Sequence, residues 1–358
     1  MRRLPVFLLR KETEWMARSA RRRAISAVST LLVAVTAALA TTSGGAPLGA
    51  QVPAGSERAP VPLEIFQSKE DRLFQVGYRL ATANAAYCRS PVRVTGLLIH
   101  DAYSYGNPEA VRLLFGLAGD IGVQSVAPGS PAARAGLAQD DTILAIDGTP
   151  VATGWQKAEE RWERVFAIRD AIDASAEKGA VELTWSHSGG YPETARLEPV
   201  DACPTRFELI NSKDSAAADG ERVLVGENFP GFDYDEAAFA AAIAHEMAHN
   251  IFRHPQTFEV TGWKRSLVRL SERDADRLMP WLLQNAGYDP RAAVRFMQTW
   301  GPRHGGWIFR KRTHDGWDER VELIEAEITR IEQFVDPNGM ADWRTHFTSE
   351  LETHLAND

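Results

Sequence analysis

Cysteine is scarce in this chain, because only Cys88 and Cys203 occur among its 358 residues. Neither lies just after the apolar stretch at 24–40, so nothing indicates a lipoprotein anchor. In an exported chain, a lone pair of cysteines is more often bridged than free. The sequence therefore predicts a Cys88–Cys203 disulfide, with two buried thiols as the alternative.

Long hydrophobic runs are absent after residue 50, where no stretch reaches about 18 apolar residues. That part of the chain is not expected to span a membrane. Residues 1–50 differ, because a basic start leads into the apolar stretch and then into small residues, the pattern of a signal peptide. We expect export to the periplasm or cell envelope, with cleavage after Ala40 or Ala50. An uncleaved N-terminal anchor is the alternative and would be the only membrane contact.

After residue 50, basic residues are outnumbered by acidic ones. Residues 1–23 carry eight Lys and Arg against two Glu, and residues 24–50 carry no charge. Since the whole chain has a formal charge of −8, the part after residue 50 carries −14. Such an acidic surface is a poor partner for a phosphate backbone. The charge therefore argues against nucleic acid as a partner.

The first part of the remaining chain is a linker followed by a helix. Residues 51–62 form a Pro-rich linker. Leu73, Val76 and Leu80 recur at steps of three and four, which predicts an amphipathic helix that ends at about Cys88. We assign this helix to an N-terminal segment, 63–109, that packs on the C-terminal domain.

The middle of the chain, 110–200, has short β-rich runs broken by Pro and Gly, with helices expected at 131–136 and 156–177. The last part, 201–358, is mainly helical. Its second helix, which starts near Lys264, is expected to be interrupted near Pro280, because proline lacks the backbone donor that a helix interior needs.

The β-rich part resembles a PDZ domain of the type attached to bacterial exported proteases. The resemblance is carried by "SPAARAGL", "DDTILAIDGTPV" and "VELTWS". PDZ domains bind an extended peptide by adding it to a sheet edge, so the resemblance implies a peptide ligand. "FGLAGDIG" (115–122) is expected to supply the loop for the peptide end. A spacer without a ligand is the alternative.

The stretch "AAIAHEMAHNIF" contains the pattern H-E-x-x-H at His245, Glu246 and His249. On an α-helix, residues i and i+4 lie on one face, about 5 to 6 Å apart. Two imidazoles so placed can bind one zinc ion, at about 2.0 to 2.1 Å from each nitrogen. Glu246, one position along, can turn to the open position of the metal and act as a base. Two surface histidines are the alternative unless a third ligand exists.

"SERDADRL" supplies a candidate third ligand. Glu272 and Asp276 are also four apart and share a helix face. The 23 residues that separate Glu272 from His249 allow one connection and a returning helix. Asp276 is then placed to accept the second ring N–H of a zinc-bound histidine. A solvated charged face is the alternative.

H-E-x-x-H, then E-x-x-A-D and then "AGYDP" resemble the gluzincins of metallopeptidase family forty-eight, over about residues 205–335. This family includes HtpX, the CAAX prenyl endopeptidase and exported peptidases of bacterial envelope quality control. The resemblance implies one zinc ion per chain. The matching positions are His245, His249 and Glu272 as the zinc ligands, Glu246 as the catalytic base and Asp276 as the supporting carboxylate.

Two further roles follow from the resemblance. "THDGWDERV" is similar to the T-H-P-x-x-x-x-R-I stretch of the family, with Asp315 where proline is usual. It makes His314 a candidate to stabilise the tetrahedral intermediate and Arg320 a cation that organises the site. Family members also pair substrate backbone with a strand before the active-site helix. Here that strand would be Val223, Leu224 and Val225, whose apolar run suits an edge strand. A buried strand has the same pattern and is the alternative.

The sequence thus predicts an α+β protein, a mainly helical gluzincin domain with an inserted PDZ-like domain. The expected function is an exported zinc endopeptidase that cleaves protein or peptide substrates, with Glu246 activating a zinc-bound water. An intramembrane site-two-type protease does not fit, because no membrane spans flank the motif. A second alternative is a peptide-binding, chaperone-like envelope protein whose zinc is structural or masked by a fourth ligand, such as His254, His304 or His314.

Overall fold

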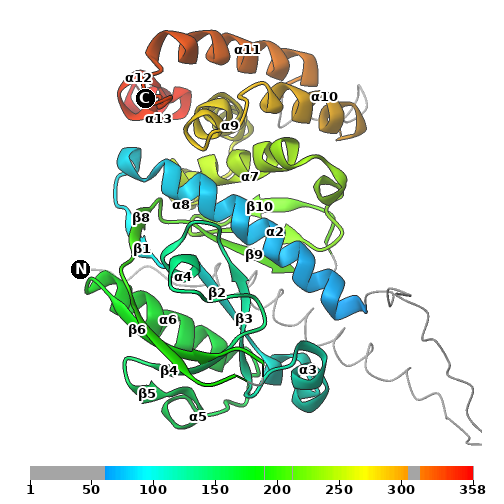
Figure 1. The fold of residues 1–358 in the computed structure, drawn as a ribbon. Helices are drawn as coiled ribbons and strands as arrows, with labels where there is room; N and C mark the ends of the chain where they lie inside the picture. The colour runs from blue at the N-terminus through cyan, green and yellow to red at the C-terminus, as the bar shows by residue number, and fades with distance from the viewer. Residues whose placement is uncertain (1–60, 189, 212, 305–314, 358) are drawn as a thin grey trace, which may run out of the picture. The chain divides into compact units, whose positions relative to one another are not determined.

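The computed structural model describes residues 61–188, 190–211, 213–304 and 315–357. The predicted signal peptide and nearly all of the linker therefore lie outside the described residues. Those that are described belong to one unit of the chain, Ala59–Asp358, in which helices and sheets are mixed (Figure 1). This mixture agrees with the predicted α+β class. In the described part of the chain, no helix is both long and apolar enough to cross a bilayer.

The first described helix, α2 (Pro62–Ala83), begins with a proline in its first turn, where the missing N–H costs nothing. It buries Leu73, Val76 and Leu80, the face that the sequence predicts. It ends before residue 88, because the Asn84 side chain donates both to the Leu80 carbonyl, at 2.9 Å, and to the Leu282 carbonyl, at 3.1 Å. A short 3-10 turn, η1 (Ala85–Tyr87), follows.

The β-rich unit is an antiparallel sheet with the strand order β2-β3-β4-β6-β7, and β5 pairs with β4. Val123, Ile143 and Trp185 of the sheet are almost fully buried together with Ile168 of α6. The strands are β2 (Leu97–Asp101), β3 (Ile121–Val126), β4 (Thr142–Ile146), β5 (Thr149–Pro150), β6 (Val181–Ser186) and β7 (Glu193–Leu197). The helices are η2 (Ala102–Tyr105), α3 (Pro108–Phe115), α4 (Pro131–Arg134), α5 (Val151–Gly154) and α6 (Glu163–Glu177).

Three predicted boundaries in this unit are wrong. The unit starts before residue 110, because β2 begins at Leu97 and pairs with β3. The helix predicted at 131–136 is shorter, because Gly136 takes a φ of 94°, a conformation that ends helices. The helix predicted at 156–177 begins only at Glu163, after a segment in which Lys157 is ion-paired with Asp120 at 3.0 Å.

Two features join the chain segments that enter and leave the β-rich unit, a strand pair and a disulfide. Strand β1 (Val92–Val94) pairs antiparallel with β8 (Val200–Ala202), so the chain enters and leaves side by side. Cys88 and Cys203 form a disulfide next to this pair, with their Cα atoms 5.5 Å apart. The predicted bridge is therefore confirmed.

The C-terminal part contains a second sheet, of order β10-β11-β9, in which β11 lies parallel to β9 and antiparallel to β10. Its strands are β9 (Arg206–Ile210), β10 (Ala216–Ala218) and β11 (Arg222–Gly226). Its helices are η3 (Pro230–Asp233), α7 (Glu236–Ile251), α8 (His254–Thr261), α9 (Arg265–Asn285), α10 (Ala292–His304), α11 (Trp317–Phe334), α12 (Trp343–His346) and α13 (Glu350–Asn357).

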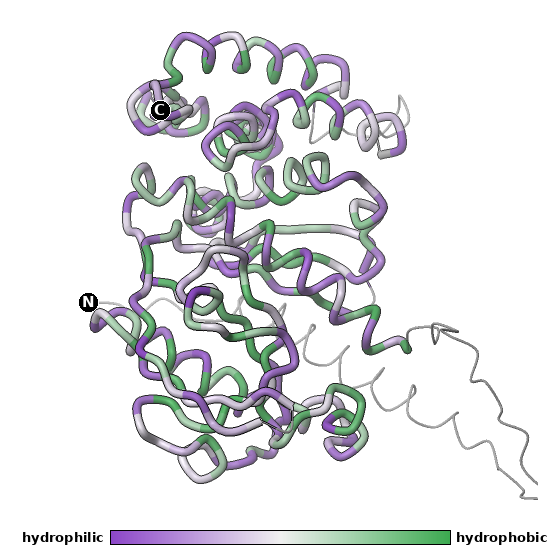
Figure 2. Tube along the Cα trace, in the orientation of Figure 1, coloured by the Kyte–Doolittle hydropathy of each residue, from purple (hydrophilic) through white to green (hydrophobic). Residues whose placement is uncertain are grey.

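Helix α7 is the centre of this part. It packs against β10 and β11 on one side and against α9 and α10 on the other (Figure 1). Much of its length is hydrophobic, whereas α11 alternates between hydrophilic and hydrophobic residues (Figure 2). The short side chains of Ala240, Ala241 and Ala244 are fully buried, which lets these neighbours approach closely. The polar residues of α7 are thereby held between a sheet and a helical layer.

Helix α9 runs without interruption through Pro280, so the predicted break there is wrong. A proline removes one helical hydrogen bond and crowds the preceding turn. Here the residues around it, Met279, Trp281 and Leu282, are all fully buried, and the Trp281 indole donates to Glu327 at 3.0 Å. Tertiary packing on both sides of the proline therefore outweighs its local preference.

Candidate metal centre

The H-E-x-x-H segment forms the second half of α7. The Asp235 side chain caps the helix start by accepting the Ala238 N–H at 2.9 Å, and alanines favour the helix that follows. His245, Glu246 and His249 then share one face, which borders a cavity of about 970 Å³. The predicted placement of the motif on a helix is observed.

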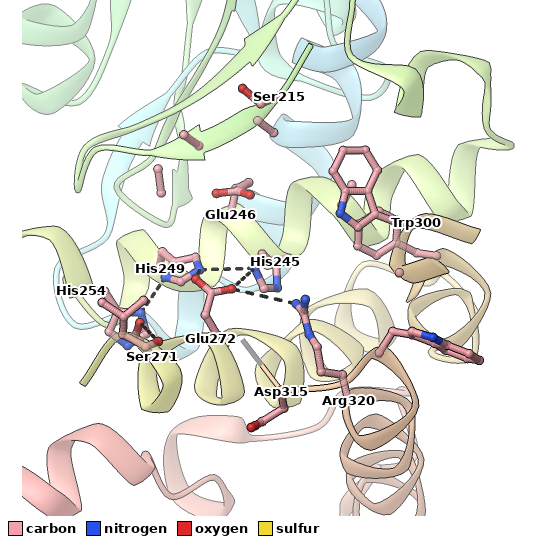
Figure 3. Close-up of a pocket in the computed structure, with 18 of the residues that line it drawn as sticks. Ser215, His245, Glu246, His249, His254, Ser271, Glu272, Trp300, Asp315 and Arg320 are labelled. Carbon is pink, nitrogen blue, oxygen red and sulfur yellow. Dashed lines mark hydrogen bonds and ion pairs between the residues drawn. The ribbon is translucent and has the colours of Figure 1, made fainter. Parts of the chain in front are cut away.

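Glu272 comes to the two histidines from α9. Its carboxylate oxygens lie 3.5 Å from His245 Nε2 and 3.6 Å from His249 Nε2, and the two Nε2 atoms are 3.3 Å apart (Figure 3). Two donors about 2.1 Å from one tetrahedral ion would be about 3.4 Å apart. The three side chains converge on a single point as a metal site requires. They therefore fit a zinc ion.

Asp276 and Arg320 support this cluster from behind. Asp276 Oδ1 lies 3.1 Å from His245 Nδ1, the ring nitrogen that does not face the cluster. Arg320 of α11 donates two hydrogen bonds to the Asp276 carboxylate, at 2.5 and 2.6 Å. An outer carboxylate of this kind fixes the orientation and tautomer of a metal-binding histidine.

The neighbours of the two histidines shift their pKa values in opposite directions. Burial lowers the pKa of His245, but the Asp276 and Glu272 carboxylates outweigh burial and raise that pKa to about 10. Burial dominates at His249 and lowers its pKa to about 4. Burial would raise the pKa of Asp276, yet Arg320 and His245 hold it below its ordinary value. Asp276 is thus held as an anion, the form that can accept a hydrogen bond from the His245 ring.

Glu246 is not part of the donor cluster. It projects between the cluster and β10 (Figure 3), where the backbone N–H of Ala218 favours the charged form of its carboxylate. Burial raises the pKa of Glu246 to about 7, even though the charge of His245 opposes the rise. A carboxylate with such a pKa can both accept and return a proton near neutral pH.

The edge strand beside the cavity is β10, not the segment that the sequence suggests. Val223, Leu224 and Val225 lie in β11, which is paired on both sides, so their prediction as an edge strand is wrong. The reading of that run as a buried strand holds instead. A three-alanine strand has little apolar bulk or β-branching, so no pattern in the sequence predicts β10.

Strand β10 presents part of its backbone to the cavity. Ser215 O accepts the Gly226 N–H at 2.9 Å, so Ser215 faces β11. Residues along an antiparallel strand alternate between the two sides. Ala216 and Ala218 therefore turn their N–H and C=O groups away from β11, and the Ala218 N–H accordingly lowers the pKa of Glu246. Ala216 is left to face the cavity.

His254 is a neighbour of the site that the motif does not include. Its Nδ1 lies 2.9 Å from Nδ1 of His249, on the side of the ring opposite the cluster (Figure 3). It is buried, and burial lowers its pKa to about 2. His254 is therefore a neutral partner of His249 and not a fourth donor. His254 lies five residues after His249 and beyond the end of α7 at Ile251, so helical periodicity does not predict that the two rings meet.

Of the other predicted residues, His314 and the His304 side chain lie outside what the structure describes. Asp315, which replaces the usual proline, accepts a hydrogen bond from Arg273 at 2.5 Å and lies 3.5 Å from Arg269. It thus ties the start of α11 to α9. Arg320 contacts Asp276 and lines the cavity, which agrees with an organising cation.

Comparison with known proteins concerns the β-rich unit. Residues 122–160 match the family model of the PDZ domain. A PDZ domain is present. The match runs from β3 to the segment before α6, inside the unit built on the β2–β7 sheet. No curated protein matches the chain. The resemblance to metallopeptidase family forty-eight stays a prediction.

The sheet of the PDZ domain changes the expected peptide position. The loop at 115–122 leads into β3, which is paired with both β2 and β4. It therefore does not open onto a free edge, and the prediction of a peptide-end loop there is wrong. The edges of the sheet are β2 and β7, so an added peptide strand would have to pair with one of these.

Proposed function

We propose that this protein is an exported, zinc-dependent endopeptidase of the gluzincin type that cleaves protein or peptide substrates in the periplasm or cell envelope. The observation that carries the proposal is the position of Glu246 between three converging donors and a cavity-facing edge strand. His245, His249 and Glu272 would hold the zinc ion. A bound zinc ion polarises a carbonyl and makes water more acidic at neutral pH.

The remaining steps belong to side chains and backbone of the chain. The extended substrate pairs with β10 through Ala216, which places the scissile bond in front of Glu246. The Glu246 carboxylate takes a proton from the attacking water and later delivers it to the leaving amine. Asp276 and Arg320 keep the His245 ring oriented. The PDZ domain takes a peptide end at a sheet edge and steers substrates to the cavity.

A chaperone-like protein with a masked zinc site is the competing function. It requires a fourth protein donor at the cluster. His254, the one candidate in the described part of the chain, points to the back of His249. Among the residues that the structure describes, the geometry therefore supports an open metal position, as catalysis requires.

The test is casein digestion by the purified full chain, with and without a chelator, together with zinc analysis. Glu246→Gln should keep about one zinc per chain and lose at least about a hundredfold in turnover, because it removes only the base. Glu259→Gln, a change at an exposed residue of α8, is the matched control and should be neutral. His249→Ala should lose the zinc, whereas the exposed His354→Ala should not. Normal zinc in His249→Ala, or full activity in Glu246→Gln, would refute the assignment.

A further inference from the structure

The turn that joins β10 to β11 contacts the helix that carries the two histidines of the donor cluster. The Gly220 N–H in this turn donates to the side-chain oxygen of Asn250 at 2.8 Å. Asn250 directly follows His249 in α7 and is buried, with 6% of its surface exposed. One end of the edge strand is thus tied to the donor helix by a side chain that lies outside the H-E-x-x-H pattern.

The turn needs glycine at position 220. Gly220 has a φ of 100°, a conformation that strains other residues. A Cβ there would lie 2.0 Å from Nε2 of Gln256 in α8. Within the turn, the Asp219 carboxylate accepts the backbone N–H groups of Glu221 and Arg222, at 3.1 and 2.7 Å. These bonds brace the turn, so a contact that holds Gly220 also holds the end of β10.

Asn250 lies on the face of α7 that meets β10. It follows Glu246 by four residues, so the two side chains project on one side of the helix, about 6 Å apart along its axis. Gly220 follows Ala218 by two residues, a span of at most about 7 Å. The Ala218 N–H favours the charged form of the Glu246 carboxylate, and both residues line the cavity. The strand and the helix thus meet at two points with nearly the same spacing.

The amide group of Asn250 shows which of its atoms the contact uses. Asn250 Nδ2 is buried and has no hydrogen-bond partner among the described residues. Burial of an unpaired N–H is unfavourable, so an apolar side chain would suit this position better if it only filled space. The oxygen, in contrast, satisfies the Gly220 N–H. The contact with the turn is therefore what asparagine supplies here.

We propose that Asn250 is a positioning residue for substrate: through Gly220 it keeps β10 beside the donor helix, with the backbone of Ala216 placed to pair with an extended peptide. The inference rests on the proposed peptidase function. Pairing between strands depends on register, and β10 is a three-residue strand with one neighbour in its sheet. Asn250 acts through β10 and takes no part in the proton transfer.

Hydrogen exchange tests whether Asn250 holds the turn. Asn250→Leu keeps a side chain of similar size and removes the acceptor, so amide exchange in the purified full chain should become at least about tenfold faster over 214–226 and stay unchanged in α9. Asn250→Asp restores an acceptor and should return exchange toward the wild-type rate. Asn357→Leu, at an exposed position of α13, is the matched control and should change nothing. Unchanged exchange in Asn250→Leu would overturn the proposal.

Substrate binding tests whether the position of β10 matters. In the Glu246→Gln background, Asn250→Leu should weaken binding of fluorescein-labelled casein by at least about tenfold at normal zinc content, because the displaced strand pairs poorly with a peptide. In the active protein, the same change should raise KM for casein by a similar factor and lower kcat by less than about threefold. Gly220→Ala disturbs the contact from the strand side and should reproduce the loss. Gly339→Ala, at a glycine of similar φ with open space around it, should not.

The outcomes separate this role from the proposed activity. Casein binding that depends on Asn250, without any cleavage by the wild type, would keep the positioning role and refute the peptidase. Faster exchange over 214–226 with unchanged casein binding and KM would overturn the positioning role and leave the peptidase standing. If Asn250→Leu loses zinc, Gly220→Ala decides the question, because it lies outside the donor helix.

Discussion

His249 and His254 face each other through their Nδ1 atoms, so one of these must carry a proton and the other must accept it. If His249 binds a metal through Nε2, its proton is on Nδ1 and His254 is the acceptor. The proton of His254 is then on Nε2, which is buried and has no hydrogen-bond partner among the described residues. The cost of burying that N–H indicates that the contact with His249 matters.

We therefore expect His254→Phe to weaken zinc binding by about tenfold or more, because it removes the acceptor that fixes the His249 ring. His254→Asn should restore part of the affinity, since its side-chain oxygen can accept in place of Nδ1. Competition with a fluorescent chelator measures both. Unchanged affinity in the phenylalanine variant would show that His249 needs no such partner.

His100 is a second buried histidine, in β2 of the PDZ domain, with its ring between Tyr105 and Phe115. Burial lowers its pKa to about 4, so the folded protein binds fewer protons here than the unfolded chain between about pH 4 and pH 6.5. The free energy of unfolding should therefore fall as the pH falls through this window.

The His100 contribution should be about 2 kcal/mol between about pH 7 and pH 5. Denaturant unfolding of the wild type and of His100→Gln at both values isolates it, because all other groups titrate in both proteins. The variant should lose less stability on acidification. Parallel losses would mean that His100 is not held neutral.

At the scale of elements, β10 is a short strand with two different sides. Its pairs with β11 join Ala216 to Val225, Ala217 to Leu224 and Ala218 to Val223. Ala217 faces β11, whereas Ala216 faces the cavity, so a change at one position affects the sheet and a change at the other affects the site. The strand thus offers its own internal control.

Ala216→Pro should lower peptide cleavage by at least about tenfold with normal zinc content, because it deletes a cavity-facing N–H that one hydrogen bond to substrate would use. Ala217→Pro removes a donor within the sheet and should lower stability instead. Cleavage rates, zinc analysis and thermal unfolding separate the two effects. Full activity in Ala216→Pro would mean that substrates do not pair with β10.

At the scale of the whole molecule, the PDZ domain and the C-terminal part are held together at several points. The disulfide and the β1–β8 pair close the base of the PDZ domain. Arg206 of β9 reaches α6 and lies 2.7 Å from Asp173. The backbone N–H of Arg93 in β1 donates to the Glu177 carboxylate of α6, at 2.9 Å. The base is thus fixed by covalent and polar contacts together.

The disulfide closes a separation of 115 residues, and bridges over long loops restrict the unfolded chain strongly. The double variant Cys88→Ser, Cys203→Ser should lose about 2 to 5 kcal/mol of stability while it retains zinc. Urea unfolding measures the loss. Dithiothreitol should destabilise the wild type and leave the variant unaffected. Equal stability of both proteins without reductant would contradict the bridge.

The sequence alone determined the features that depend on spacing along the chain. The i, i+4 spacing of His245 and His249 puts two donors on one helix face, and the same spacing puts Glu272 and Asp276 on one face. The α2 face and the disulfide partners follow similarly, because helical periodicity is local and two cysteines allow only one intramolecular bridge.

The tertiary structure decided what depends on approach between distant segments. A strand becomes an edge only when its neighbours are placed, so β10 rather than Val223–Val225 borders the cavity. Pro280 stays helical because packing on both sides exceeds its local cost. The position of His254 behind His249 follows from the approach of α8 to α7, and Trp300 of α10 meets Phe229, a residue far from it in the sequence. Such contacts are non-local, and no periodicity in the sequence encodes them.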